Sequence, residues 1–182
     1  MTDNNNIFAC VDGSRSSLAV ADYAIWAARS LETPLTFLHV MDNPHASAKR
    51  DLSGSLGLGT REKLLEEMVE LEEKRGKLER EKGRAILADA VSRAKEGGLD
   101  AVDDLLQNGD IREVILERED EMRLLVLGKQ GRDGDEVAMH IGSHLAGILS
   151  AIHCPALVTP LEYKPPERFL IAYDGSPTAY KV

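Results

Sequence analysis

The apolar residues of the chain fall into five short runs, separated by longer segments with a helical pattern. Most of these runs are nearly continuous, which is typical of a strand covered on both faces. Between them, apolar residues recur every three or four positions, as on one face of an amphipathic helix. The runs lie at residues 7–12, 35–41, 100–106, 123–128 and 155–159. The pattern therefore predicts an α/β fold with a parallel sheet, helices on both faces and right-handed crossovers.

The longest predicted helix covers residues 61–97, and its middle is strongly charged. The stretch EEKRGKLEREKGR, residues 72–84, contains Leu78 as its only apolar side chain. We expect this portion to project into solvent. A solvated surface is the commoner meaning of such a charged run, and a partner-binding helix is the alternative.

Composition excludes two classes of function. The formal charge of −9 and the pI near 5.1 argue against a nucleic-acid-binding protein, because neutralising phosphates requires a basic face. No apolar run approaches the roughly 18–20 residues that a membrane-spanning helix needs, so no membrane segment is expected. Cys10 and Cys154 lie in or beside apolar runs, and we interpret them as buried thiols of a cytoplasmic protein rather than a disulfide or metal pair.

One stretch has the pattern of a phosphate-binding loop. The apolar run Leu124 to Leu127 is followed by Gly128, Gly131 and then Gly142-Ser143, where the next amphipathic segment begins. Glycines let the backbone approach an anion closely, and a helix start presents unpaired N–H groups to it.

His39 lies inside the second apolar run. A histidine in such a position is more often a hydrogen-bonded core residue than a catalytic one.

The end of the chain repeats its beginning. Residues 169–182, FLIAYDGSPTAYKV, match IFACVDGSRSSLAV at the start, and Asp174-Gly175-Ser176 falls on Asp12-Gly13-Ser14. A repeat of this kind indicates that a second copy of the same unit begins here. A fragment of one strand and one helical turn cannot bury its apolar face alone. We therefore expect a chain that represents part of a two-copy protein.

These motifs together resemble the universal stress protein family. The resemblance is carried by Gly128, Gly131, Gly142 and Ser143, by VDGS at residues 11–14, and by the His-Val pair at the end of the second run. It implies a Rossmann-like five-stranded sheet in the order 3-2-1-4-5, of the adenine nucleotide alpha hydrolase type. It also implies a domain at residues 1–160, a linker at 161–167 and the start of an incomplete second domain at 168–182.

The resemblance further implies an ATP site at the glycine loop. Asp12 would bond the ribose or a phosphate-bound metal, and the backbone of Val40 would meet the adenine edge. Leu127 and Cys10 would line the pocket. Four residues would wrap the phosphates: Gly128, Gly131, Gly142 and Ser143. In this fold order, Asp12 and Gly128 would flank the crevice at the topological switch point, where open α/β sheets bind ligands.

The glycine loop departs from the family motif in its length and its charge. Ten residues separate Gly131 from Gly142, one more than in the motif, and one residue adds roughly 3.3–3.6 Å of chain. The loop also carries Asp133, Asp135 and Glu136. A triphosphate beside three carboxylates requires Mg²⁺, or a loop conformation that turns the acids outward.

Two functional classes remain open. One is a stress-response or regulatory protein that binds ATP, and the other is a non-nucleotide dimerisation module of the same fold. No nucleophile–base pair is evident, so there is no strong case for an enzyme, and slow ATP hydrolysis is implied only by the resemblance. In either class we expect a homodimer through the last predicted strand, at Ala156, Leu157 and Val158, since an edge strand offers unpaired backbone groups.

Overall fold

The computed structural model describes residues 6–41, 58–129, 143–172 and 174–175, with the backbone alone at 58–66 and 143–144. Within these ranges, five strands form one parallel sheet in the order β3-β2-β1-β4-β5. They are β1 (Asn6–Cys10), β2 (Leu35–Met41), β3 (Val102–Asn108), β4 (Met122–Gly128) and β5 (Ala156–Thr159). The predicted fold class and strand order are therefore confirmed.

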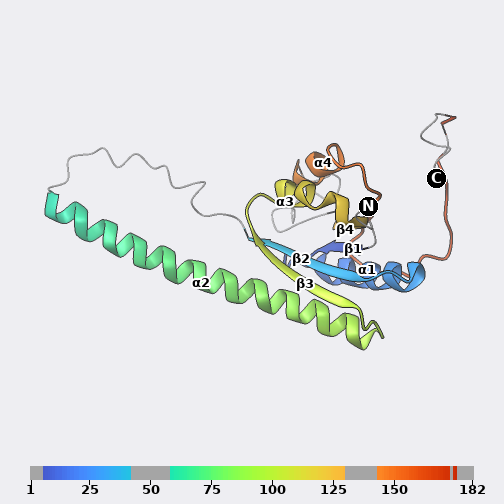
Figure 1. Cartoon of the computed structure of the whole chain (residues 1–182), viewed down its shortest axis with the longest axis horizontal. Coiled ribbons are helices and arrows are strands. Elements are labelled where there is room, and N and C mark those ends of the chain that lie inside the picture. The colour runs from blue at the N-terminus through green and yellow to red at the C-terminus, as the bar shows by residue number, and fades with distance from the viewer. Residues whose placement is uncertain (1–5, 42–57, 130–142, 173, 176–182) are drawn as a thin grey trace.

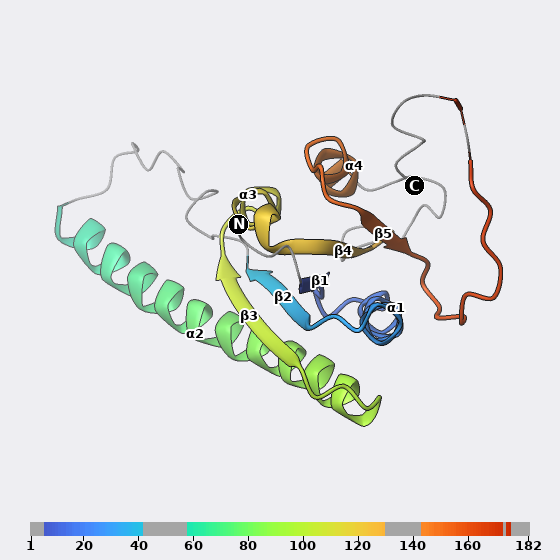
Figure 2. The same cartoon turned by 45° about the vertical axis from the view of Figure 1, so that its right-hand side comes forward.

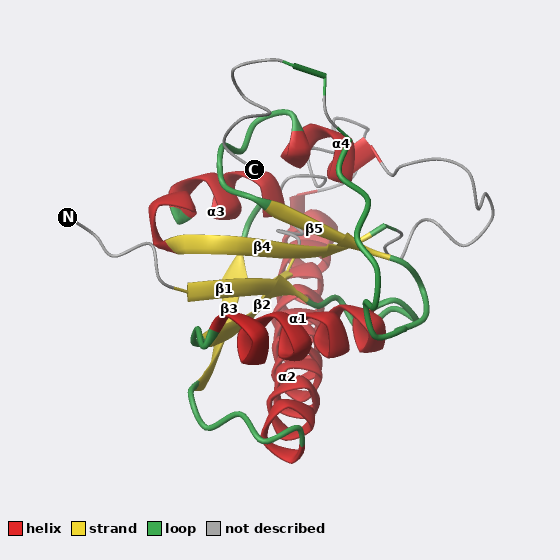
Figure 3. Ribbon diagram, turned by 90° about the vertical axis from the view of Figure 1, so that its right-hand side faces the viewer, coloured by secondary structure: helices red, strands yellow, loops and turns green. Residues whose placement is uncertain are grey.

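Helices cover both faces of the sheet, in pairs (Figure 3). The helices α1 (Ser17–Leu31) and α2 (Leu58–Glu96) lie on one face, and α3 (Ile111–Glu117) and α4 (Ser143–Leu149) lie on the other. A short 3-10 turn, η2 (Glu119–Glu121), leads into β4. Figure 2 shows α2 crossing below β2 and β3, opposite α3 and α4. Among the helices of the described residues, none is both long and apolar enough to span a bilayer.

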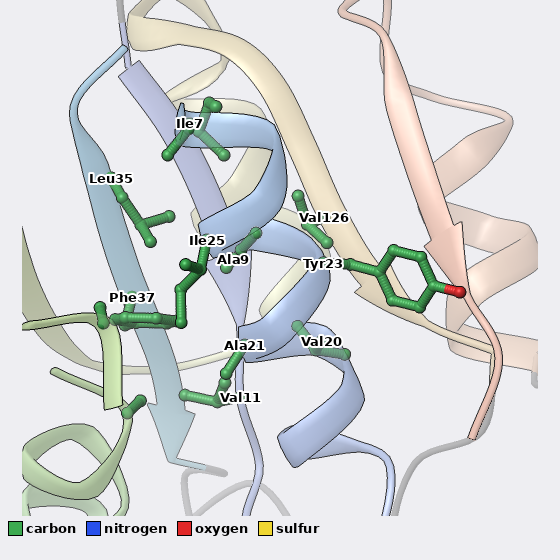
Figure 4. Close-up of a cluster of buried hydrophobic side chains, with 14 of the residues drawn as sticks. Ile7, Ala9, Val11, Val20, Ala21, Tyr23, Ile25, Leu35, Phe37 and Val126 are labelled. Atoms are coloured by element: carbon green, nitrogen blue, oxygen red, sulfur yellow. The ribbon is translucent and has the colours of Figure 1, made fainter. Parts of the chain in front are cut away.

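The three central strands, β2, β1 and β4, send side chains into two separate cores, one on each face of the sheet. Ile7, Ala9 and Phe37 are buried against α1 and α2 (Figure 4). Phe8 and Leu38 point the other way, into the core below α3 and α4. A strand buried on both sides has no polar face, which is why β1 and β2 are continuous rather than alternating apolar runs.

The helix α2 packs on the sheet through a glycine. A Cβ added to Gly83 would lie 2.7 Å from Leu106 Cδ1 and 2.9 Å from His39 Cδ2. Only a residue without a side chain lets the helix come this close to β2 and β3. The His39 ring beneath it is 4% exposed, and its Nδ1 lies 2.6 Å from the Val11 carbonyl oxygen, to which it donates a hydrogen bond. The core interpretation of His39 is confirmed.

The residues of α2 before Gly83 extend past the sheet, beyond the carboxyl ends of β2 and β3 (Figure 1). The helix has 39 residues, which corresponds to about 58 Å at 1.5 Å per residue. Leu71 and Leu78 in this outer part are 65% and 66% exposed. The predicted projection into solvent is confirmed.

Two element boundaries differ from the sequence pattern. The first strand ends at Cys10 rather than Asp12, because Asp12 and Gly13 turn away to bond with α1. The third strand runs on to Asn108, past the apolar run that ends at residue 106, although the sequence Gln107-Asn108-Gly109 has the composition of a turn. Pairing with β2 continues as far as Met41 opposite Asn108 and overrides the local turn preference. Cys10 and Cys154 are both free.

Replacing Gly83 with alanine tests the close approach of α2. We expect Gly83→Ala to lower the free energy of unfolding by about 1–3 kcal/mol, because the added methyl group overpacks the contact with His39 and Leu106. Gly76→Ala is the matched control, since nothing lies within 4 Å of a Cβ at that position in the same helix. It should leave stability unchanged or raise it by up to about 1 kcal/mol through helix propensity. Equal effects of the two substitutions in urea unfolding would contradict the packing.

Candidate functional site

The described site lies where β1 ends between β2 and β4. The connection from β1 leads through α1 to β2, whereas β4 is reached on the other side of the sheet through α3. The strand order therefore reverses at β1 and β4. In open α/β sheets, the crevice outside the carboxyl ends of the strands at such a switch point is the usual ligand site.

Ser17, at the start of α1, determines where β1 ends. Its hydroxyl oxygen accepts hydrogen bonds from the backbone N–H groups of Asp12 at 3.1 Å and Gly13 at 3.0 Å. The same hydroxyl donates to Asp12 Oδ1 at 2.8 Å, and that oxygen also accepts the Ser14 N–H at 2.9 Å. Gly13 has a φ of 74°, a conformation that glycine adopts without strain. The N–H of Asp12 is thus directed to the helix and not to a neighbouring strand.

The early end of β1 leaves backbone groups of both neighbouring strands facing a gap. Along a parallel strand, successive residues direct their N–H and C=O groups to opposite neighbours. On β2, the Leu38 carbonyl accepts from Val11 and the Met41 carbonyl accepts from Gly109, beyond β3. Val40 therefore faces the β1 side, past the last residue of β1.

The same alternation holds on β4. The N–H groups of Leu125 and Lys129 bond to carbonyl oxygens at Pro155 and Thr159, on the β5 side. Gly128, between these two odd-numbered positions, therefore faces the β1 side. Two strand spacings separate β2 from β4, about 9.5 Å. Val40 and Gly128 thus present backbone donors and acceptors to one gap, across the end of β1.

Three of the expected pocket residues share one face of the sheet. Leu127 is buried in the core that faces α3 and α4, and Cys10 and Val40 pack against it. They come from the carboxyl ends of β4, β1 and β2. Burial, and secondarily the charge of Asp12, raises the pKa of the Cys10 thiol to about 12. Cys10 is therefore a neutral, apolar wall residue at pH 7 and not a nucleophile.

The phosphate-binding part of the expected site is described only in part. Gly131 and Gly142 lie outside the described residues, as do Asp133, Asp135 and Glu136. Ser143 is the first residue of α4, and Gly128 is the last residue of β4. The described structure thus brings together Cys10, Asp12, Val40, Leu127 and Gly128. His39 points to the other face of the sheet, towards α2, and is not part of this group.

Two residues at the site were not singled out by the sequence pattern. Ser17 is one of three serines at residues 14–17, and its hydroxyl holds the Asp12 loop, whereas Ser16 at the N-cap position makes no side-chain cap bond. Gln107 lies on β3 opposite Val40, on the side of the strand shared with Leu105. The sequence did not indicate Gln107 as a strand residue, because β3 continues through a segment with the composition of a turn.

Comparison with known proteins identifies the family of the chain. Residues 4–160 match the model of the universal stress protein family. The chain belongs to the universal stress protein family. A universal stress protein of Synechocystis sp. is 32% identical over 179 residues, which are 97% of this chain. The chain spans 62% of the length of that relative.

Solved structures of universal stress proteins share the fold. One, a universal stress protein in complex with cAMP, superposes with a TM-score of 0.56 at 19% identity, covering 87% of this chain and 98% of its own. Another, from Archaeoglobus fulgidus in complex with dAMP, has a TM-score of 0.52 at 15% identity, covering 87% and 99%. At these identities the likeness concerns the fold.

Removing the Ser17 hydroxyl tests its control over the end of β1. We expect Ser17→Ala to destabilise the protein by about 1–3 kcal/mol, since two backbone N–H groups lose their acceptor. Ser14→Ala is the matched control, because the hydroxyl it removes bonds, among the described residues, to Ser16 Oγ at 2.8 Å, and the variant keeps the N–H bond to Asp12. Thermal unfolding of both variants measures the difference. A Ser14 variant as unstable as the Ser17 variant would contradict the assigned role.

Proposed function

We propose that the protein binds an adenine nucleotide, ATP, in the crevice between the Asp12 turn and the glycine loop after β4. One observation carries the proposal: the backbone groups of Val40 and Gly128 face a common gap where β1 ends. A purine has donors and acceptors around a flat ring, so backbone N–H and C=O groups can read its edge. Apolar side chains beside this gap can pack against the flat face of the purine ring.

The base would lie against Cys10, Val40 and Leu127. All three contribute apolar side chains from one face of the sheet, and pockets for small ligands are mostly apolar with a few placed polar groups. Val40 would supply the polar contact to the adenine edge. Gln107 lies beside Val40 and could add a side-chain amide there.

The sugar and phosphates would lie between Asp12 and the glycine loop. The carboxylate of Asp12 is held in place by Ser14 and Ser17 and can accept bonds from ribose hydroxyls or approach a phosphate-bound Mg²⁺. No group of three or more His, Cys, Asp or Glu side chains that could hold a metal occurs in the described ranges. Mg²⁺ would therefore enter with the phosphates, as it commonly does. Gly128, Gly131, Gly142 and Ser143 would wrap the phosphates.

The relatives support an adenine nucleotide as the ligand class. Universal stress proteins of the same fold have been solved with cAMP and with dAMP. These two ligands share the adenine base and differ in the sugar and phosphate. We propose ATP rather than a nucleoside monophosphate, because the long glycine loop after Gly128 offers more backbone groups than a single phosphate needs.

The role that fits this site is regulatory rather than catalytic. The thiol of Cys10 is neutral and His39 lies on the opposite face, so neither supplies a nucleophile to the crevice. We propose a stress-response protein of the cytoplasm in which ATP is a structural or signalling ligand and is hydrolysed slowly at most. The free thiols of Cys10 and Cys154 fit a reducing compartment.

We also propose that residues 168–182 begin a second universal stress protein domain. The repeated Asp-Gly-Ser motif supports this, because Gly175 has a φ of 75° and Gly13 has a φ of 74°. Phe169, Leu170 and Ile171, which correspond to β1, are exposed.

For the described chain, β5 is an edge strand, and we propose homodimer pairing along Ala156, Leu157 and Val158. Val158→Asp should abolish that pairing, and sedimentation of the full-length chain measures the loss of the dimer.

Binding and mass spectrometry together test the nucleotide proposal. Protein purified without added nucleotide is denatured, and any released small molecule is identified by mass spectrometry; we expect ATP or a product of ATP. Calorimetric titration of the emptied protein with Mg-ATP should then show one site per chain. Gly142→Val should weaken that binding at least about tenfold, because its side chain would occupy the phosphate approach.

Gly147→Ala is the matched control for Gly142→Val. Gly147 lies in α4, which begins at Ser143, and nothing lies within 4 Å of a Cβ at that position. It should bind Mg-ATP as the original chain does. Absence of released nucleotide and of heat on titration would favour the alternative, a dimerisation module without a nucleotide. Unchanged affinity in the Gly142 variant would place the ligand elsewhere.

A further inference from the structure

Gln107 is a polar residue at the end of an otherwise apolar row beside the crevice. It lies on β3 opposite Val40, and its side chain leaves the sheet on the face that Leu105 shares. That face carries the wall formed by Cys10, Val40 and Leu127. The Gln107 side chain is half-buried, and its amide makes no hydrogen bond among the residues that the structure describes. The amide is therefore available to a ligand that lies against this wall.

The backbone of Gln107 is held by the neighbouring strand, which leaves the side chain to contact a ligand. The N–H of Gly109 bonds to the Met41 carbonyl oxygen, on the β2 side. Odd-numbered residues of β3 therefore direct their backbone groups towards β2, and Gln107 is one of them. The amide ends a long side chain, which can cross the strand spacing of about 4.8 Å. Gln107 can thus reach a base that lies against Val40.

The backbone of Val40 alone does not distinguish adenine from guanine. Its N–H and C=O groups face the gap side by side, so they recognise one acceptor next to one donor. Adenine offers the acceptor N1 beside the N6 amino group, and guanine offers the acceptor O6 beside N1–H. Both purines can satisfy Val40 in slightly different positions. Selection between them requires a further polar group.

We propose that the side-chain amide of Gln107 selects adenine over guanine in the crevice, an inference that rests on the proposed nucleotide site. Glutamine can form two hydrogen bonds with adenine, because its Oε1 accepts from the N6 amino group and its Nε2 donates to N7. Guanine carries acceptors at both O6 and N7. Whichever way the amide is turned, Oε1 of Gln107 faces one of these acceptors and is repelled by it.

The position of Gln107 against the wall strengthens this selection. The wall excludes water from one side of the base, and a polar group that loses its partner in such a place costs more than it does in water. Adenine satisfies both ends of the amide, whereas guanine satisfies one end and opposes the other. An apolar residue of the same size at position 107 would accept either base.

Calorimetric titration of the full-length chain with Mg-ATP and with Mg-GTP tests the proposal. We expect Mg-ATP to bind at least about tenfold more tightly than Mg-GTP. In Gln107→Leu, which removes the amide and keeps the size of the side chain, the two affinities should become about equal. Asn108→Ala is the matched control, because Asn108 is the next residue of β3 and its exposed side chain leaves the sheet on the opposite face. It should keep the original preference.

A modified nucleotide tests the contact with N7 separately. 7-deaza-ATP has a carbon in place of N7 and keeps both N1 and the N6 amino group. It should bind the original chain about fivefold more weakly than ATP, because Nε2 of Gln107 loses its acceptor. Gln107→Leu should bind ATP and 7-deaza-ATP equally.

The outcomes separate this inference from the proposed nucleotide site. If Mg-ATP binds and Gln107→Leu keeps the original preference over Mg-GTP, the role of Gln107 is overturned and the site remains. Equal binding of Mg-ATP and Mg-GTP by the original chain would have the same meaning. Equal binding of ATP and 7-deaza-ATP by the original chain would also overturn it, and that titration needs no folded variant. Absence of binding by both ATP and GTP would overturn both proposals.

Discussion

The hydrogen bonds between Ser17 and the turn at Asp12 and Gly13 are the interaction on which the site depends. They draw the N–H groups of two residues away from the sheet and end β1 at Cys10. The strands on either side continue to Met41 and Gly128. The gap between them exists because the central strand is the shorter one, and the backbone groups of Val40 and Gly128 face it as a consequence of strand alternation.

The two faces of the sheet contribute differently: one lines the site, and the other packs against the long helix α2. The core below α3 and α4 provides the wall formed by Cys10, Val40 and Leu127. The opposite face holds α1 and α2, and its packing is set by Gly83 against His39. Because that contact lies near the carboxyl ends of β2 and β3, the outer part of α2 extends from the same edge of the sheet as the crevice.

The apolar pattern predicted most of the fold, because a strand buried on both sides cannot be polar. It predicted the sheet, the helices on both faces, the buried His39 and the exposed Leu78. It placed the end of β1 two residues too late, because the Ser17 side chain captures the N–H of Asp12 and an apolar pattern does not report side-chain hydrogen bonds. It missed Gln107 at the site, because the extension of β3 depends on pairing with β2, which is distant in the sequence. Gly131 and Gly142 lie outside the described residues, and their part in the site stays a prediction.

Amide hydrogen exchange with and without Mg-ATP tests the central claim most directly, because it reports which backbone groups a ligand covers. Exchange is followed by fragment mass spectrometry on the full-length chain. Slower exchange at residues 8–17, 38–41 and 125–129, with residues 67–82 unchanged, is the result that this account predicts. Protection confined to the opposite face, at α1 and α2, or no change at saturating Mg-ATP, would contradict it.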